Sequence, residues 1–102
     1  MSKKLDISVV VPTYNEEESL PELVAWVGRV MAANGYSYEM LFIDDGSSDS
    51  TWKVIERLAA ENSTIRAIRF RRNYGKSAAL YAGFEAAVGE VQKKSKKESK
   101  YA

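Results

Sequence analysis

LFIDDGSSDST, residues 41–51, passes from an apolar run through two adjacent aspartates into a string of small polar residues. Residues 38–43 predict a buried strand, and Asp49 or Ser50 can cap a helix that continues to about Glu61. A strand that leads directly into a helix is the repeating unit of parallel sheets. The stretch therefore predicts an α/β fold.

A similar unit precedes this stretch. Residues 6–12, DISVVVP, form a short β-branched run that ends at a proline, which is typical of a buried parallel strand. The apolar residues of the next segment recur on one helical stripe. Ser19 and Glu22 have the spacing of a capping box at the start of that helix, and Gly35 follows its end. The segment therefore predicts an amphipathic helix.

The third unit consists of a predicted strand over residues 64–70 and a predicted helix over about residues 76–90. The alanines and glycines of this helix allow it to lie close against a sheet. Three such units joined by right-handed crossovers predict a Rossmann-like three-layer sandwich, with a parallel sheet in the order 3-2-1 and flanking helices. In such sheets ligands bind outside the carboxyl ends of the strands.

The composition limits the classes of function. The chain has 102 residues, of which 45% are hydrophobic and 28% charged, and it has no cysteine and no histidine. Disulfide scaffolds, thiol nucleophiles, zinc fingers and imidazole bases are therefore excluded, and any metal must be held by oxygen. The apolar runs are far shorter than the roughly 20 residues of a membrane helix, and no signal peptide is visible. We expect a cytoplasmic protein.

Residues 92–102 differ in composition from residues 1–91. Five lysines and one glutamate give this end a net charge of +4, against +1 for the whole chain. Such a segment can bind an acidic membrane or nucleic acid, but we favour a disordered or cloning-derived end. We therefore expect one domain over residues 1–91, a tail over residues 92–102 and no nucleic-acid partner.

The loops after the three predicted strands are polar and must meet at one edge of the sheet. The residues to consider together are Tyr14, Asn15, Glu16, Asp44, Asp45, Arg71, Arg72, Asn73 and Lys76. Each loop alone has a structural explanation as a turn or a helix start. That explanation does not account for the two aspartates, because adjacent carboxylates repel and a turn needs only one. A base edge, ribose hydroxyls or a divalent cation would engage both.

Residues 75–77 read GKS, as at the end of a phosphate-binding P-loop. That motif needs a glycine five positions earlier, where this chain has Phe70, so a P-loop is excluded. Dinucleotide binding is excluded as well, because no G-x-G-x-x-G follows the first strand. A basic helix start remains, formed by Arg71, Arg72 and Lys76, which can contact a phosphate.

Three motifs together resemble a known family. V-V-V-P-T-Y-N-E-E, F-I-D-D-G-S-S-D-S-T and R-N-Y-G-K-S-A-A-L-Y-A-G-F-E-A-A-V-G-E occur in this order over about residues 6–91. They resemble the amino-terminal half of family 2 glycosyltransferases, and most of all the dolichol-phosphate mannose synthase group and its bacterial relatives that glycosylate undecaprenyl phosphate. The resemblance implies a GT-A fold, here truncated, in which a nucleotide-diphosphate sugar lies across the carboxyl ends of the strands.

The resemblance also implies residue roles. Nucleotide-binding roles would fall to Pro12, Tyr14, Glu16, Ile43, Asp45 and Lys76. Tyr14 would pack near the base, Ile43 and Asp45 would line the base and ribose, and Lys76 would lie toward the diphosphate. Supporting roles would fall to Asn15, Asp44, Asn73 and Gly75.

One motif of the family has no counterpart here. The family continues into a fourth strand that ends in an aspartate-x-aspartate motif, which holds the divalent metal at the diphosphate. This chain has no aspartate after Asp49. We therefore expect no metal site and no catalytic residue in this chain and no sugar transfer by this chain alone, while the parent enzyme would use Mg²⁺ or Mn²⁺. Any membrane association would come from other parts of the parent.

Two functions stay open. The first is the donor-binding half of a glycosyltransferase that transfers a hexose to a polyprenyl phosphate or a saccharide. The second is an inactive, excised or engineered α/β fragment that mainly self-associates. Without the fourth strand, residues 8–11 would form an unpaired apolar edge, which predicts a homo-oligomer along that edge. A less favoured alternative is that Val91 and the first tail residues add a substitute strand.

Overall fold

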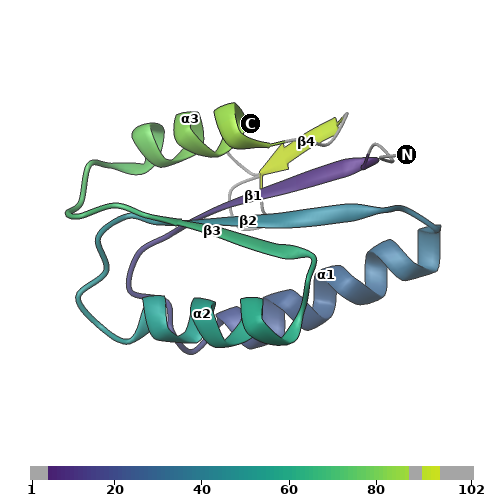
Figure 1. The fold of residues 1–102 in the computed structure, drawn as a ribbon, viewed down its shortest axis with the longest axis horizontal. Helices are drawn as coiled ribbons and strands as arrows, with labels where there is room; N and C mark the ends of the chain where they lie inside the picture. The colour runs from purple at the N-terminus through teal and green to yellow at the C-terminus, as the bar shows by residue number, and fades with distance from the viewer. Residues whose placement is uncertain (1–4, 88–90, 95–102) are drawn as a thin grey trace.

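The computed structural model describes residues 5–87 and 91–94, in which four strands alternate with three helices. The elements are β1 (Ile7–Thr13), α1 (Leu20–Asn34), β2 (Tyr38–Asp44), α2 (Thr51–Glu61), β3 (Ile65–Arg69), α3 (Lys76–Ala86) and β4 (Val91–Lys94). All strand pairs are parallel, and α1 and α2 cover one face of the sheet while α3 covers the other (Figure 1). The predicted three-layer α/β fold is confirmed.

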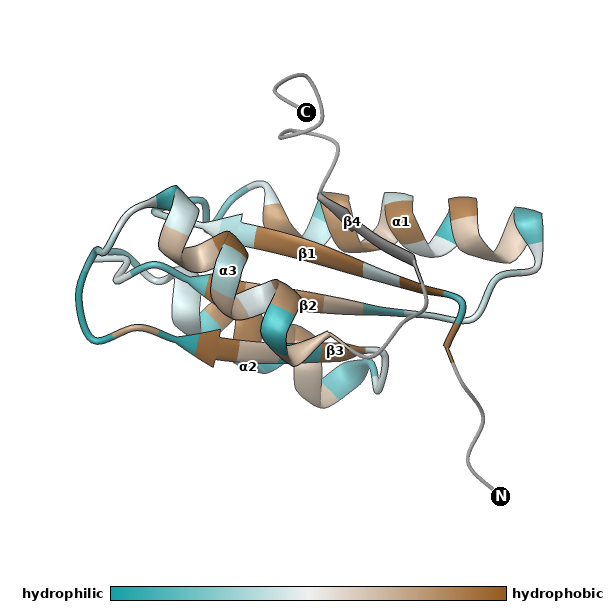
Figure 2. Cartoon of the chain, turned by 90° about the horizontal axis from the view of Figure 1, so that it is seen from above, coloured by the Kyte–Doolittle hydropathy of each residue, from teal (hydrophilic) through white to brown (hydrophobic). Residues whose placement is uncertain are grey.

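The larger hydrophobic core lies between the sheet and the layer formed by α1 and α2. Alternate residues of β1 and β2 pack there against the apolar stripes of the two helices; the fully enclosed members include Val9, Val11, Leu20, Met40, Phe42 and Ile55. The other face of β2 carries Leu41 and Ile43, which pack with Ala79 of α3. Because helices cover both faces, the two central strands are almost continuously apolar (Figure 2). This explains the uninterrupted run at residues 40–43.

Helix α3 lies unusually close to the sheet. A Cβ atom built on Gly83 would lie 2.3 Å from Val10 Cγ1 and 3.2 Å from Ile43 Cδ1. Glycine leaves the space that the two branched side chains fill. The prediction that small residues bring this helix close to the sheet is therefore confirmed.

A buried polar network contacts the carboxyl-terminal end of α3. Glu39 on β2 is 2% exposed, and its carboxylate accepts hydrogen bonds from Ser8 Oγ at 2.6 Å and from Arg66 Nη1 at 2.7 Å. Arg66 Nη1 also donates to the Ala86 carbonyl at 3.1 Å. A buried carboxylate is tolerated when it is paired and hydrogen-bonded in this way. The network connects three neighbouring strands to the last turn of α3.

The predicted capping box at the start of α1 is wrong. Ser19 is the residue before the helix, but it has nearly helical dihedral angles and makes no side-chain cap. Its hydroxyl turns back to donate to the Glu16 carbonyl at 3.2 Å. At the other end Gly35 adopts the left-handed conformation, with φ of 70°, as its position after the helix predicts. None of the helices in the described part of the chain has the length and apolar character needed to cross a bilayer.

The fourth strand extends the predicted order. β4 pairs in parallel with residues 7–10 of β1, so the sheet order is β3-β2-β1-β4, and the less favoured alternative of a strand formed by Val91 and the first tail residues is confirmed. The edge expected at residues 8–11 is therefore covered over most of its length, which removes the basis for an oligomer along it. Residues 92–94, assigned to the tail, belong to the sheet because backbone groups make the ladder whatever the side chains are; residues 95–102 lie outside the described part.

We predict that Gly83→Ala lowers the free energy of unfolding by about 2 kcal/mol, because the new methyl overlaps Val10 on a rigid strand. Gly28→Ala on α1 is the matched control, since its Cβ would meet only Tyr38 Oη at 3.5 Å, an ordinary contact. Alanine favours the helix by up to about 1 kcal/mol over glycine, so this control keeps or gains stability. Urea denaturation followed by circular dichroism measures both, and equal effects would contradict the close packing of α3.

Candidate functional site at the carboxyl edge of the sheet

Three loops meet where β1, β2 and β3 end, as the sequence predicts. They are residues 14–19, residues 45–50 and residues 70–75, and we call them the first, second and third loops. In Figure 1 they lie together at the end of the sheet away from the amino terminus. The second loop lies between the other two and makes hydrogen bonds to both. One partner in each of these hydrogen bonds belongs to residues 41–51.

The first loop is fixed to the second through Asn15. Its backbone N–H donates to Ser47 Oγ at 2.9 Å, and its side-chain Oδ1 accepts from Ser48 N at 2.9 Å and Asp49 N at 3.3 Å. Asn15 is also left-handed, with φ of 51°, a conformation that asparagine tolerates better than most residues. Asn15 therefore joins the first loop to the second, and the supporting role that the family resemblance implies for it stays a prediction.

Two further contacts connect the same loops at the start of α2. Thr51 Oγ1 accepts from Glu16 N at 2.9 Å, and Glu17 Oε1 accepts from Ser50 N at 2.9 Å. The second bond satisfies a backbone N–H that the start of α2 leaves without a partner inside the helix. Glu16 and Glu17, which follow β1, are thus joined to the beginning of α2.

Asp49 caps α2, as the sequence suggests. Its Oδ1 accepts from Thr51 Oγ1 at 2.5 Å and from Thr51 N at 2.9 Å. The hydroxyl bond is the main reason that the pKa of the Asp49 carboxyl lies below its ordinary value, and the backbone bond adds to the effect. Ser50 is the residue directly before the helix, and it makes no side-chain cap.

The third loop is held by Asp45, which is 4% exposed. Asp45 Oδ1 accepts from Tyr74 N at 2.8 Å, and Oδ2 accepts from Gly75 N at 3.0 Å. The Asp45 backbone carbonyl accepts from Asn73 Nδ2 at 3.2 Å. The aspartate thus holds the three residues that precede α3, which include Asn73 and Gly75.

The neighbouring glycine lets the second and third loops touch. Gly46 has φ of 74°, and a Cβ atom there would lie 2.3 Å from Arg72 C and 2.5 Å from Asn73 N. These are backbone atoms of the third loop, which cannot turn away as a side chain can. Glycine is therefore required at position 46 for two reasons. Its φ is positive, and the backbone of the third loop leaves no room for a Cβ atom.

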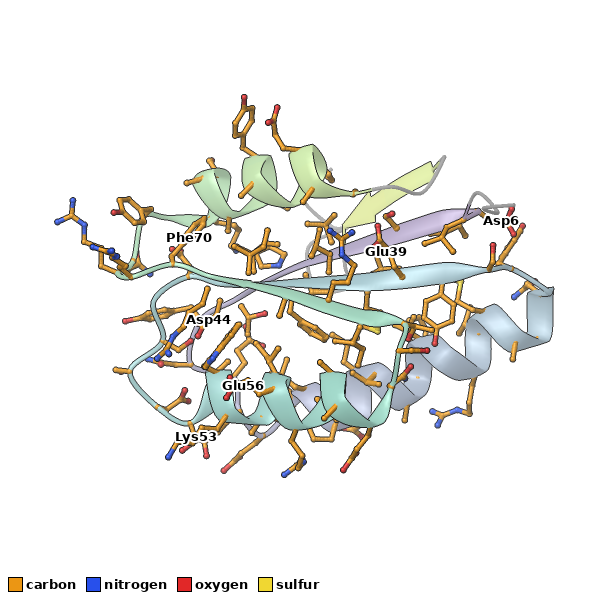
Figure 3. The ribbon with its side chains drawn as sticks, in the orientation of Figure 1. Asp6, Glu39, Asp44, Lys53, Glu56 and Phe70 are labelled. Atoms are coloured by element: carbon orange, nitrogen blue, oxygen red, sulfur yellow. The ribbon has the colours of Figure 1, made fainter. Side chains whose placement is uncertain are left out.

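Asp44 and Asp45 point to opposite sides of the sheet. Asp44 is fully buried on the α2 side (Figure 3), where its Oδ1 accepts from Ser47 N at 3.0 Å. Within the described residues its Oδ2 has no hydrogen-bond partner. Since successive residues of a strand face opposite ways, the two carboxylates neither crowd each other nor converge on one ligand. Asp44 thus bonds within its own loop, and the supporting role that the family resemblance implies for it stays a prediction.

A small pocket gathers five of the six predicted nucleotide-binding residues. Its volume is about 80 Å³, and it is lined by Pro12, Thr13, Tyr14, Glu16, Asp45 and Lys76. It lies at the carboxyl end of β1, where the order of the strands reverses and parallel sheets bind ligands. The sixth residue, Ile43, is fully buried beneath α3 and does not line this pocket. Thr13 was not predicted, although it directly precedes the predicted Tyr14.

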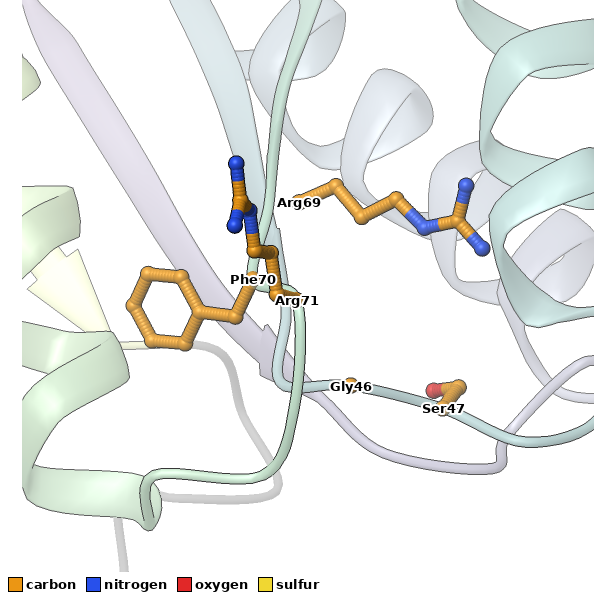
Figure 4. A pocket seen from close by; sticks show the side chains of 5 residues that line it. All are labelled: Gly46, Ser47, Arg69, Phe70 and Arg71. Carbon is orange, nitrogen blue, oxygen red and sulfur yellow. The ribbon is translucent and has the colours of Figure 1, made fainter.

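Another pocket, of about 250 Å³, lies at the end of β3 and is lined by Gly46, Ser47, Arg69, Phe70 and Arg71 (Figure 4). The Arg69 guanidinium lies 5.5 Å from the centre of the Trp52 ring, whereas Arg71 points the other way. Arg72 lies over the Tyr74 ring at 5.1 Å. The structure therefore does not bring Arg71 and Arg72 into the pocket of Lys76.

The described residues do not fit a divalent metal. No group of three or more aspartates and glutamates among residues 5–87 and 91–94 is placed to hold one. The Asp45 oxygens accept backbone amides, and Asp44 faces the opposite side of the sheet. The carboxylates of the site instead hold the loops together.

Comparisons with known proteins identify related folds. The sequence model described as Glycosyl transferase family 2 matches residues 8–91. A mannosyltransferase from Pyrobaculum calidifontis, solved with GDP-Man and Mn²⁺, superimposes with a TM-score of 0.67 at 24% identity, over 89% of this chain and 27% of that one. S. aureus TarS 1–349, solved with UDP, superimposes with a TM-score of 0.70 at 23% identity, over 89% of this chain and 27% of that one. This chain spans about a quarter of those lengths.

We predict that Gly46→Ala lowers the free energy of unfolding by about 3 kcal/mol, because it adds a clash with backbone to an unfavourable φ. Gly35→Ala is the control: its φ is also positive, at 70°, but nothing lies within 4 Å of the added Cβ. It should cost only about 1 kcal/mol. Thermal or urea unfolding of both variants gives the comparison, and similar losses would show that the two loops do not touch at Gly46.

The Asp49 cap predicts a pH effect. Thr51→Val removes the hydroxyl donor, so the pKa of Asp49 should rise toward its ordinary value of 3.8, whereas Thr51→Ser should keep it low. Because folding lowers this pKa, the stabilisation is complete above the pKa of the unfolded chain and is lost as pH falls through the folded value. A carboxyl ¹³C titration measures both variants, and an unchanged Asp49 pKa in Thr51→Val would contradict the assigned cause.

Proposed function

Because the chain belongs to glycosyl transferase family 2, we propose that it binds the nucleotide part of a nucleotide-diphosphate sugar at the pocket beside β1. The observation that carries the proposal is the composition of that pocket. It is lined by the exposed ring of Tyr14, by Glu16 and by Lys76, the first residue of α3. An aromatic ring, a hydrogen-bond acceptor and a cation suit a base, a ribose and a diphosphate respectively.

The geometry suggests how the donor lies. A volume of about 80 Å³ holds only part of a nucleotide, so the rest would extend over the open rim of the sheet. Pro12 and Tyr14 offer apolar surface to the base, and Glu16 can accept hydrogen bonds from ribose hydroxyls. The diphosphate would then lie at Lys76 and the start of α3, where the positive end of the helix dipole favours an anion. Asn15 joins the first loop to the second, and Gly46 allows the second and third loops to touch.

The reaction of the whole enzyme is a further part of the proposal. We propose that the parent transfers a hexose to a polyprenyl phosphate or a saccharide, on the cytoplasmic side of the cell. The complexes of the two similar proteins with GDP-Man and with UDP support a nucleotide-sugar donor. Mn²⁺ in one of them supports the use of a divalent cation, Mg²⁺ or Mn²⁺, by the parent. Such a cation would neutralise the leaving diphosphate, and we assign it no ligand among the described residues.

We predict that UDP or GDP shifts the backbone amide signals of Tyr14 and Lys76 at millimolar concentration. Lys76→Met should raise the dissociation constant about tenfold, as expected for loss of a charge-assisted bond to phosphate. Lys53→Met is the control, because Lys53 is exposed on α2, away from the pocket (Figure 3). Absence of any shift with either nucleotide, or equal weakening by both substitutions, would rule out this site.

A further inference from the structure

A pocket at the end of β3 lies outside the proposed nucleotide site. Its volume is about 250 Å³, and it is lined by Gly46, Ser47, Arg69, Phe70 and Arg71, none of which lines the pocket of the proposed nucleotide site. We propose that this hollow, the β3-end pocket, binds a phosphate monoester group through Arg69 and Arg71. The inference goes beyond the proposed function and does not depend on it.

The polar side chains that line the β3-end pocket offer hydrogen-bond donors to a ligand. Each guanidinium group carries five N–H donors and no acceptor. Ser47 Oγ accepts from Asn15 N at 2.9 Å, and within the described residues its own O–H has no acceptor. Among the same residues, no aspartate or glutamate lines the pocket. A ligand that fits this lining brings acceptor oxygens and negative charge.

In the described part of the chain, no carboxylate pairs with either arginine of the pocket. Arg66, on the same strand, pairs with Glu39 at 2.7 Å. Within residues 5–87 and 91–94, neither Arg69 nor Arg71 forms an ion pair. Asp44 lies opposite Arg69 in the ladder between β2 and β3, but it is fully buried and does not line the pocket. Both positive charges are therefore available to an anion.

The two arginines differ in how they are held. The Arg69 guanidinium lies 5.5 Å from the centre of the Trp52 ring, a cation–π contact that holds the side chain without using its N–H donors in hydrogen bonds. Its planar fork can therefore donate to two oxygens of one phosphate. Arg71 is exposed and points the other way (Figure 4), so it must turn to reach the same group. We therefore expect Arg69 to contribute more than Arg71.

The size and the apolar wall of the pocket suit a small phosphate monoester. Pockets that enclose drug-sized ligands measure roughly 300–1,000 Å³, so about 250 Å³ holds a smaller group. The phosphate of a monoester has three acceptor oxygens and a charge of about −1.5 to −2 at neutral pH, more than a carboxylate offers. It can engage both guanidiniums at once, and its organic part can lie against the half-buried ring of Phe70.

Amide chemical shift titration of the whole chain with inorganic phosphate and with phenyl phosphate, at constant ionic strength, tests the proposal. We expect both anions to shift the amide signals of Ser47 and Phe70 and the indole N–H signal of Trp52 at millimolar concentration. Phenyl phosphate should bind about threefold more tightly, because its ring adds a contact with Phe70. Shifts confined to Tyr14 and Lys76 would place the anion in the proposed nucleotide site and overturn the proposal.

Substitutions of exposed arginines separate a built site from general attraction of anions. Arg69→Gln should raise the dissociation constant for phenyl phosphate about tenfold, and Arg71→Gln about threefold. Arg69→Lys keeps the charge but loses the fork, so it should cost at least about threefold. Arg57→Gln removes the same charge from an exposed position on α2 and should change the constant less than about twofold. Equal effects of Arg69→Gln and Arg57→Gln overturn the proposal.

A phosphate monoester can be soluble or carried by a lipid, and vesicles distinguish the two sources. Co-sedimentation with phosphatidylcholine vesicles, with and without phosphatidic acid, is measured beside the titration. Binding that requires phosphatidic acid and is lost in Arg69→Gln assigns the pocket to a lipid phosphate, whereas phenyl phosphate shifts without vesicle binding assign it to a soluble one. If neither phenyl phosphate nor phosphatidic acid binds, the proposal fails, and the UDP and GDP titrations at Tyr14 and Lys76 judge the proposed function separately.

Discussion

Two hydrogen bonds, from the backbone amides of Tyr74 and Gly75 to the carboxylate of Asp45, join the end of β2 to the beginning of α3. These bonds lie at the carboxyl edge of the sheet. There the third loop leads the chain from β3 to α3, on the face of the sheet opposite α2. Asn15 makes the corresponding connection between the first and second loops. The second loop is therefore the common partner of both its neighbours, and the shape of the pocket depends on it.

The adjacent aspartates are explained by the alternation of a strand. Asp44 turns toward α2 and accepts an amide within its own loop, while Asp45 turns toward α3 and accepts amides from another. Each carboxylate organises one side of the sheet edge. The paired acidic residues, which suggest a metal site when the sequence is considered alone, are thus two separate supports. The family resemblance led to the same conclusion for Asp44 but assigned Asp45 to the ligand.

The sequence predicts most of the fold because the apolar periodicity is strong and local. Residues 38–43 lie on a central strand, and the small residues of α3 pack as close to the sheet as expected. The predictions that failed depend on contacts between distant segments. Residues 92–94 read as tail because of their lysines, yet their backbone joins Val91 in completing the sheet beside β1. The position of Arg72 over the Tyr74 ring depends on a contact that no spacing rule reveals.

The central claim is that the second loop holds two neighbouring loops in position to form a nucleotide site at the end of β1. A crystal structure of the protein with UDP or GDP tests it most directly. The account predicts a base beside Pro12 and Tyr14, a diphosphate at Lys76, and hydrogen bonds from Tyr74 and Gly75 to Asp45 that persist in the complex. A nucleotide bound instead between Arg69 and Arg71 would contradict it.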